Sequence, residues 1–308
     1  MTNSSITPDL PQLRGLERIQ YTCIVFIATI IRAIPPRAFD AIVRFLGWSF
    51  WHFLPLRRRN AVERIRFHLQ VSQDEAQKIA RQSFTENCRS FLEIFKVKDF
   101  DPKSSITKIV TNENYDELIK EEGPLVITIA HIGSWELMAA LMGDYKPERY
   151  KLTVVRSQRN KAIDRFLKEA RSSQGMTFVG HRDAAKFVLE GFSKNNALVA
   201  FLVDHNASRD EGRFFPFLGK PASVNIGPAM LALRGKATVF PVFLLRNPEG
   251  GHTLHVGKSL RTQELSGKIS ERVDQIAGYY TEACEDIVKK HPEQWFWMHN
   301  RWRTQPKK

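Results

Sequence analysis

The feature of this sequence that most limits its fold is a regular alternation of apolar runs and helical segments after about residue 110. The runs are short and rich in β-branched residues, as buried strands are. They are PLVITIA (124–130), KLTVV (151–155), ALVAFLV (197–203) and ATVFPVFLL (237–245), with HTLHVG (252–257) as a further candidate. Helical periodicity fills 134–143, 161–173, 183–193, 224–235 and 269–290. We therefore predict an α/β fold with a mixed, partly parallel sheet flanked by helices.

The first third of the chain has a different composition. Residues 60–96 contain neither Gly nor Pro and read as helix. The whole chain has 308 residues, which suits one large domain or two small ones, and no linker stands out. We predict a membrane-associating helical segment at 1–56, followed at 57–308 by an α/β domain with a helical lead-in.

The N-terminal segment carries signs of a membrane surface. The uncharged stretch Tyr21–Ile31 is shorter than the roughly 20 residues that span a bilayer. After it, apolar residues at near-helical spacing accompany Trp48 and Trp51, and the arginine run 57–59 follows. These features fit a helix lying in the membrane interface. The alternative is a helical hairpin that packs on its own domain. A mean hydropathy of −0.32 argues against a polytopic membrane protein.

The charge balance indicates an anionic partner. The chain has 46 Lys and Arg against 33 Asp and Glu, a formal net charge of +13. Nucleic acid, an acidic membrane, an anionic ligand and an acidic protein all fit that excess. We expect no nucleic-acid partner, because the sequence has no RNP, helix-turn-helix or zinc-finger pattern. The three cysteines form no C-x-x-C pair, which favours neither disulfides nor a cysteine zinc site and fits a reducing compartment.

Polar residues follow three of the predicted strands. His131 comes after the first run, Arg156 after the second, and Asp204 and His205 after the third. Ligands of α/β sheets bind at the carboxyl ends of strands. If these strands are parallel, the four side chains converge on one edge of the sheet.

Two residues of the segment IAHIGSWE are candidates for chemistry. His131 and Glu136 form an H-x4-[DE] pair, but His205–Asp210 is a second one, and about one is expected by chance from nine histidines. His131 stands where a strand meets a helix, and Ser134 can cap that helix. Two interpretations stay open here. The two residues are an unrelated strand end and helix start, or Glu136 orients His131 as a catalytic base.

Other chemistries fit the same segment less well. Ser134 is not in a G-x-S-x-G elbow, because Ile132 and Glu136 occupy the glycine positions. The chain has no P-loop pattern, no H-E-x-x-H and no C-x-x-C, and we therefore expect no metal. What remains is a histidine base without an enzyme nucleophile. Such a base suits direct transfer of a group to a substrate hydroxyl.

At this point the sequence resembles a known family, the bacterial lipid A biosynthesis acyltransferases of lauroyl and myristoyl type, within the wider H-x4-[DE] glycerolipid acyltransferase superfamily. The resemblance covers roughly residues 55–306. Its segments are HIGSWE, VVRSQRNKAIDRFLKEARSSQG, VDHNASRDEGRFFPFLGKPASVNIGPAMLALRGKATVFPVFLLR and HPEQWFWMHNRWRTQP. The chain departs from the pattern at Ile132, Ser134 and Ser157, where the family commonly has Phe, Asn and Pro.

The resemblance implies a glycerolipid acyltransferase-like fold and a specific reaction. The donor would be an acyl thioester on acyl carrier protein or coenzyme A, a co-substrate, so no cofactor is expected. The acceptor would be a hydroxyl of an anionic glycolipid, and the enzyme would work at the cytoplasmic face of the inner membrane. A second membrane lipid as acceptor and a non-catalytic membrane scaffold are the alternatives.

The resemblance also implies roles for the candidate residues. His131 would be the general base and Glu136 its orienting partner. Arg156 and Arg171 would bind phosphate or sugar groups or the oxyanion, with backbone N–H groups near Ser134 as further oxyanion donors. Asp204 and His205 would order the substrate site. Phenylalanines are candidates for an acyl-chain groove, with ordinary core packing as the alternative; they are Phe187, Phe192, Phe214, Phe215 and Phe217.

Overall fold

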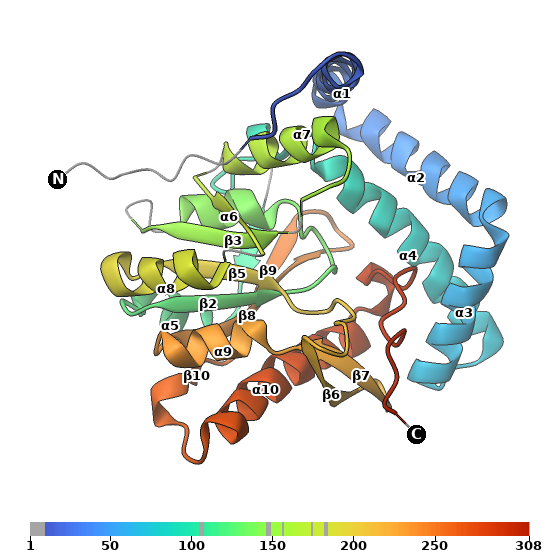
Figure 1. Ribbon diagram of the computed structural model, residues 1–308. Coiled ribbons are helices and arrows are strands. Elements are labelled where there is room, and N and C mark those ends of the chain that lie inside the picture. The colour runs from blue at the N-terminus through green and yellow to red at the C-terminus, as the bar shows by residue number, and fades with distance from the viewer. Residues whose placement is uncertain are drawn as a thin grey trace.

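The computed structural model describes residues 10–104, 108–145, 149–155, 157–173, 175–181 and 184–307. Its centre is an eight-stranded sheet in the order β1-β9-β8-β2-β5-β3-β4, with β10 paired to β8 (Figure 1). The strands of this sheet are β1 (Ile109–Thr111), β2 (Leu125–Ile129), β3 (Lys151–Val155), β4 (Thr177–Gly180), β5 (Leu198–Leu202), β8 (Thr238–Arg246), β9 (His252–Val256) and β10 (Leu260–Arg261). A separate hairpin consists of β6 (Gly212–Phe217) and β7 (Lys220–Asn225).

The pairing of the strands confirms the predicted mixed sheet. β2 runs parallel to both β5 and β8, and β3 runs parallel to β5 and β4. β9 and β10 are antiparallel to β8. All five predicted strands exist. The hairpin was not predicted, because each of its strands contains a proline, Pro216 and Pro221, which weakens the strand pattern. The three shortest strands of the large sheet were not predicted either, because a strand of two to four residues shows almost no period.

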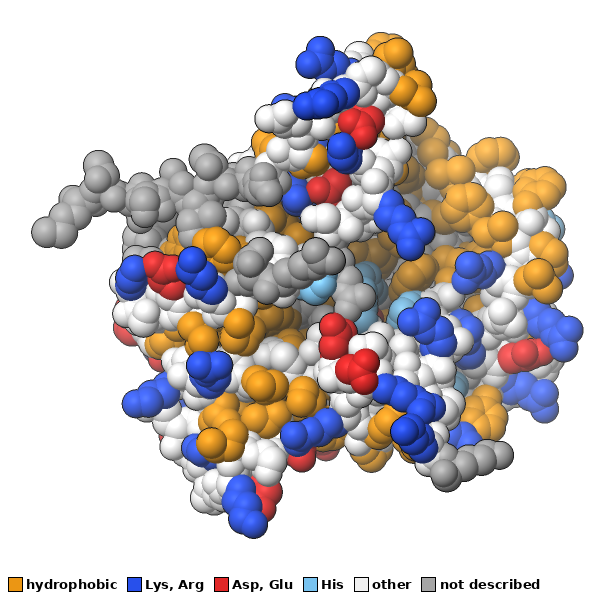
Figure 2. All heavy atoms as spheres, in the orientation of Figure 1, with side chains coloured by type: hydrophobic (Ala, Val, Ile, Leu, Met, Phe, Trp, Pro, Cys, Tyr) orange, Lys and Arg blue, Asp and Glu red, His pale blue; other side chains and the backbone are white. Residues whose placement is uncertain are grey.

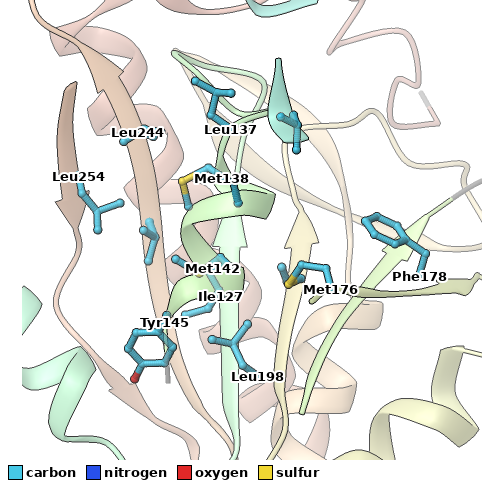
Figure 3. Packing of buried hydrophobic residues seen from close by; sticks show 14 of the residues in the cluster. Ile127, Leu137, Met138, Met142, Tyr145, Met176, Phe178, Leu198, Leu244 and Leu254 are labelled. Atoms are coloured by element: carbon cyan, nitrogen blue, oxygen red, sulfur yellow. The ribbon is translucent and has the colours of Figure 1, made fainter. Parts of the chain in front are cut away.

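Helices cover both faces of the sheet. One face packs against α5 (Tyr115–Lys120), α6 (Met138–Asp144) and α7 (Lys161–Ser172), and the other against α8 (Ala184–Asn195), α9 (Gly227–Arg234) and α10 (Ile269–Lys290). Figure 3 shows the first of these cores, in which Met138 and Met142 of α6 lie over Ile127 and Leu198 of the strands. The sheet is thus buried on both sides, as its continuous apolar strands require.

Four helices precede the sheet in sequence. They are α1 (Leu16–Ala33), α2 (Pro36–Phe53), α3 (Pro55–Leu69) and α4 (Gln73–Glu93). The helix predicted over 60–96 is therefore divided at Gln70, which adopts a left-handed conformation, and Ser72 caps the next helix by accepting from the N–H of Glu75.

These helices pack against the α/β unit and do not form a separate domain. The Tyr21 hydroxyl of α1 donates to Glu169 of α7, and α4 lies against α2 and α3. The division at residue 56 stays a prediction. Within the described residues, no helix is long and apolar enough to cross a bilayer.

Candidate active site

The imidazole of His131 is held by Asp204. The Nδ1 atom of His131 lies 2.9 Å from Oδ1 of Asp204, and the backbone N–H of His131 donates to Oδ2 at 2.9 Å. His131 comes two residues after the end of β2, and Asp204 comes two residues after the end of the neighbouring parallel strand β5. The predicted convergence at the carboxyl edge of the sheet is therefore confirmed for these two residues.

The carboxylate of Asp204 is built to stay charged. It is buried, and the indole N–H of Trp295 donates to its Oδ2 atom at 3.0 Å. Burial alone would raise the pKa of Asp204, but the charge and hydrogen bonds of His131, with the charge of His205, hold that pKa well below its usual range. An ionised Asp204 fixes the Nδ1–H tautomer of His131 and leaves Nε2 as the basic nitrogen.

Glu136 has another partner. Its two carboxylate oxygens accept from Arg171 of α7, with Nε to Oε2 at 2.9 Å and a terminal nitrogen to Oε1 at 2.6 Å. The structure shows no hydrogen bond between Glu136 and His131 in the described part of the chain. The expectation that Glu136 directly orients His131 is thus corrected: the bidentate guanidinium takes both carboxylate oxygens, and Asp204 holds the imidazole.

The guanidinium of Arg171 stays charged in this second pair. Burial lowers the pKa of Arg171, but the neighbouring carboxylate of Glu136 more than offsets that effect and the net shift is upward. Arg171 was expected to bind substrate. In the structure it forms an ion pair with Glu136, the last residue of the H-x4-E segment. Arg156 lies outside the described residues.

Two further histidines border the base. The ring of His205 stacks on His131 with centroids 4.4 Å apart, and His299 follows at 5.5 Å from His205. Burial, then the charge of His205, lowers the pKa of His299 to about 4, so this ring is neutral at physiological pH. The side chain of His131 is 18% exposed. Figure 2 shows histidine side chains reaching the surface in a hollow at the middle of this face.

The turn that carries the base is fixed by its backbone. Gly133 has a φ of +60°, and a Cβ atom there would lie 2.1 Å from the carbonyl oxygen of Leu244. The N–H of Ser134 donates to that same oxygen at 2.8 Å, and the N–H of Gly133 donates to the carbonyl of Gln294 at 3.2 Å. Only glycine fits this approach of turn and β8. The amides of both residues are occupied and cannot serve as the expected oxyanion donors.

The role expected of Ser134 is also corrected. Its hydroxyl lies 3.3 Å from Oε1 of Glu93 and 3.0 Å from Nε2 of His252, and it caps no helix. The reason is that α6 begins only at Met138, after a further turn in which the N–H of Leu137 donates to the carbonyl of Ser134.

A buried ionic network beneath this turn was missed by the sequence analysis. Arg246, at the end of β8, donates to both oxygens of Glu93 in α4 at 2.7 and 3.2 Å and to Glu86 at 3.0 Å. It also donates to the hydroxyl of Ser90, which in turn donates to the carbonyl of Gly133 at 2.7 Å. The sequence did contain one indication of this network, because Arg246 is a charged residue at the end of an otherwise apolar strand. The network ties α4, β8 and the turn together.

An apolar slot opens beside the Glu136–Arg171 pair. Its water-accessible volume is about 60 Å³, and it lies between the sheet and helices α6 and α7. Its apolar wall combines residues of β2, β3, β4 and β5 with those of α6, namely Ile129, Val155, Phe178, Ala200, Leu202, Met138 and Met142, together with Met176. The phenylalanines that we expected here line other parts of the molecule, and Phe192 and Phe217 are core residues.

The three polar groups around the base could also be metal ligands. One ligand-type atom from each of His131, Asp204 and His205 lies within 4.8 Å of the others. In this structure the imidazole of His131 and the carboxylate of Asp204 are hydrogen-bonded directly to each other. The expectation of a metal-free site stays a prediction.

These observations define a class of enzyme. A histidine base, oriented by a buried carboxylate, faces a hollow next to an apolar slot, and the rings of Trp135, His205 and Phe296 lie beside its imidazole. Such a site suits direct transfer of a group that carries a hydrocarbon chain to a hydroxyl.

The chain belongs to the bacterial lipid A biosynthesis acyltransferase family, whose sequence model matches residues 8–304. The chain is accordingly an acyltransferase, as the resemblance implied. It is 24% identical over 260 residues to the lipid A biosynthesis palmitoleoyltransferase of Escherichia coli K12, covering 82% of this chain and 81% of that protein. It is 23% identical over 202 residues to the lipid A biosynthesis lauroyltransferase of the same organism, covering 65% and 63%.

A solved structure is also similar. It is the 1-acyl-sn-glycerophosphate acyltransferase PlsC of Thermotoga maritima, with a TM-score of 0.36, 11% identity, and coverage of 87% of this chain and 97% of that one.

Proposed function

We propose that this protein transfers a fatty acyl chain from an acyl thioester on acyl carrier protein to a hydroxyl group of a lipid A precursor. The observation that carries the proposal is the His131–Asp204 pair, open to a hollow beside an apolar slot. The names of the two Escherichia coli relatives support lipid A precursors as the acceptor class.

His131 and Asp204 would handle the proton in this reaction. Nε2 of His131 accepts the proton of the acceptor hydroxyl as its oxygen attacks the thioester carbonyl. The tetrahedral intermediate collapses, the carbon–sulfur bond breaks, and the imidazolium returns the proton to the departing thiolate. Asp204 holds the ring through Nδ1–H and stabilises its charged form. Base catalysis of this kind is worth about 10²–10⁴-fold in rate.

Arg171 is the best-placed group for the developing negative charge. Glu136 takes two of its five N–H donors, and both residues line the slot. We propose that Glu136 positions this guanidinium, and that the remaining donors face the thioester oxygen or an anionic part of the acceptor. Stabilisation of an oxyanion by one such donor contributes about 10²–10³-fold.

The N-terminal helices supply the proposed membrane surface. Large apolar side chains are exposed along α1 and α2, among them Phe26, Phe45 and Phe53 at 66, 63 and 73% exposure. Figure 2 shows hydrophobic side chains gathered on the side of the molecule where these two helices lie, with Lys and Arg nearby. An amphipathic face flanked by cations binds anionic lipid surfaces. This surface supports work at the cytoplasmic face of the inner membrane.

The decisive assay combines purified protein, an acylated carrier protein and a lipid A precursor in mixed micelles, with products read by mass spectrometry. We expect one added acyl chain on the precursor and loss of at least 10²-fold in turnover for His131→Ala. Equal or better transfer to a glycerophosphate or aminolipid acceptor would reassign the acceptor. In a strain lacking the gene, lipid A should be missing one secondary acyl chain, and unchanged lipid A would contradict the proposal.

A further inference from the structure

One surface beside the active site has the shape and charge of a protein-docking site. Helix α3 carries five arginines and a single carboxylate, Glu63. An open hollow of about 770 Å³ lies against this helix, lined by Asn60, Glu63, Arg64, Arg66, Phe67 and His68. We propose that this α3 hollow receives the small acidic protein that delivers the acyl thioester. The inference rests on the function proposed above and deepens it by assigning the donor's docking surface.

The cations on this surface are available to a partner. Arg59 pairs with Glu63 at 2.8 Å and therefore neutralises the one acidic side chain of the helix. Arg57 and Arg66 are exposed, and so is Lys220 at the start of β7. Within the described ranges, none of these three has a carboxylate at ion-pair distance. A patch of one sign without internal partners attracts a protein of the opposite sign.

The composition of the hollow favours a protein over a lipid surface. Most of the exposed apolar side chains that would meet a bilayer lie on α1 and α2, whereas the hollow lies against α3. In the hollow itself the apolar contribution is the ring of Phe67, 57% exposed, with the ammonium of Lys220 4.9 Å from its centroid. One apolar anchor surrounded by cations is the pattern of a protein interface with a charged rim.

The hollow is connected to the catalytic base through one loop. Arg64 donates to the carbonyls of Trp297, Met298 and His299 at 3.0, 3.4 and 3.2 Å. The ring of His299 is next to His205, which stacks on His131. In Figure 2, Lys and Arg side chains gather between the central histidines and the edge where α3 lies. A thioester on a flexible arm would thus pass from the hollow over this loop to the base.

The test reverses charge on this surface, once at Arg66 in the hollow and once at Arg57 in the first turn of α3, and compares two donors. The variants are Arg57→Glu and Arg66→Glu, and the matched control is Arg234→Glu on α9, an exposed arginine far from this surface. One donor is the acyl chain on acyl carrier protein. The other is the same chain on pantetheine, which has no charge and no protein. We expect each variant to raise KM for the protein donor about fivefold to tenfold at low salt, with the effect shrinking as salt is added.

The outcomes separate the docking surface from the proposed function. Unchanged kinetics with pantetheine, and with both donors for Arg234→Glu, would complete the expected pattern. Equal losses with both donors, or no change with either, would overturn the docking surface while transfer by the wild type leaves the function standing. Reduced binding to phosphatidylglycerol vesicles with unaltered KM for the protein donor would assign the surface to the membrane instead. A wild type inactive with both donors would contradict the function itself.

Discussion

The imidazole of His131 is hydrogen-bonded to Asp204, which lies 73 residues further along the chain, and not to the nearby Glu136. Glu136 instead gives both carboxylate oxygens to Arg171. The H-x4-E segment therefore takes part in two separate interactions, the hydrogen bond of His131 to Asp204 that sets the proton-transfer chemistry and the ion pair of Glu136 that fixes a guanidinium at the apolar slot. This division makes the two carboxylates distinguishable by experiment.

Replacement of Asp204 should remove the orientation of the base. In Asp204→Asn the side chain keeps its size but cannot hold the Nδ1–H tautomer or stabilise the imidazolium, and we expect kcat to fall by about 10²–10⁴-fold. Steady-state assays with saturating donor measure this. Asp210→Asn is the matched control, because Asp210 is exposed and belongs to the other H-x4-[DE] pair. Near-normal kcat for Asp204→Asn would show that some other group orients His131.

Glu136 and Arg171 should behave as a coupled pair in stability. Glu136→Gln leaves the guanidinium of Arg171 without its counter-charge in a mostly buried place, and we expect a loss of about 2–4 kcal/mol in the free energy of unfolding. The double variant Glu136→Gln/Arg171→Met should recover much of that stability but not the turnover. Urea titrations report the first effect and acyl transfer the second. If the double variant is fully active, the pair has no part in the reaction.

The turn at Gly133 should tolerate no side chain. Gly133→Ala would have to place a Cβ atom against the carbonyl oxygen of Leu244 while keeping a left-handed φ, and we expect a loss of about 3 kcal/mol or more. Gly219→Ala in the β6–β7 turn is the control that measures the cost of the left-handed backbone alone. Gly219 also has a positive φ, of +76°, but a Cβ atom added there would meet no atom within 4 Å. That control should lose about 1 kcal/mol. Equal losses by chemical denaturation would mean that the contact with β8 is not tight.

Much of this architecture follows from local sequence. The strands that precede His131 and Asp204 are uninterrupted apolar runs, and such runs predict both buried strands and where they end. Parallel pairing then brings the two residues to the same edge. The sequence of each run does not say which strands are neighbours. In the sheet β5 lies between β2 and β3, so the neighbour of β2 is β5 and not the next strand along the chain, and no local pattern in the runs indicates this.

The partners of Glu136 could not be predicted in the same way. The H-x4-E motif suggests a direct contact between His131 and Glu136, which are five positions apart, although an ideal helix would place such residues about 140° apart around its axis. The segment after His131 is a turn rather than a helix, with α6 starting at Met138, and so the spacing loses its geometric meaning. Arg246 illustrates a second limit: its carboxylate partners lie in α4, more than 150 residues away, where no local pattern connects them.

The ionised state of Asp204 predicts how stability depends on pH. Its pKa is lower in the folded chain than the usual value of about 3.9, so its stabilising contribution is complete above pH 4 and is lost as pH falls from there toward the folded value. The wild type should therefore be more stable than Asp204→Asn at pH 7, and the difference should shrink below pH 4. Urea titrations at both pH values measure it. A difference that stays constant with pH would show that ionisation of Asp204 does not contribute.

The slot should set the preferred length of the acyl chain. Met176 is buried and lines the slot, so Met176→Trp would fill part of it and Met176→Ala would extend it. We expect the first change to shift the preferred donor to a shorter chain and the second to a longer one, by two or more carbons each, because a chain that no longer fits leaves apolar surface in water at about 0.8 kcal/mol per methylene. Competition between carrier-protein donors of mixed chain length gives the profile in one reaction.

Met230→Trp on α9 is the control, since Met230 is exposed and far from the slot. Because Met176→Ala also weakens the core, its profile counts only if thermal unfolding shows a folded protein at the assay temperature. A profile that neither slot variant alters would place the acyl chain elsewhere on the enzyme.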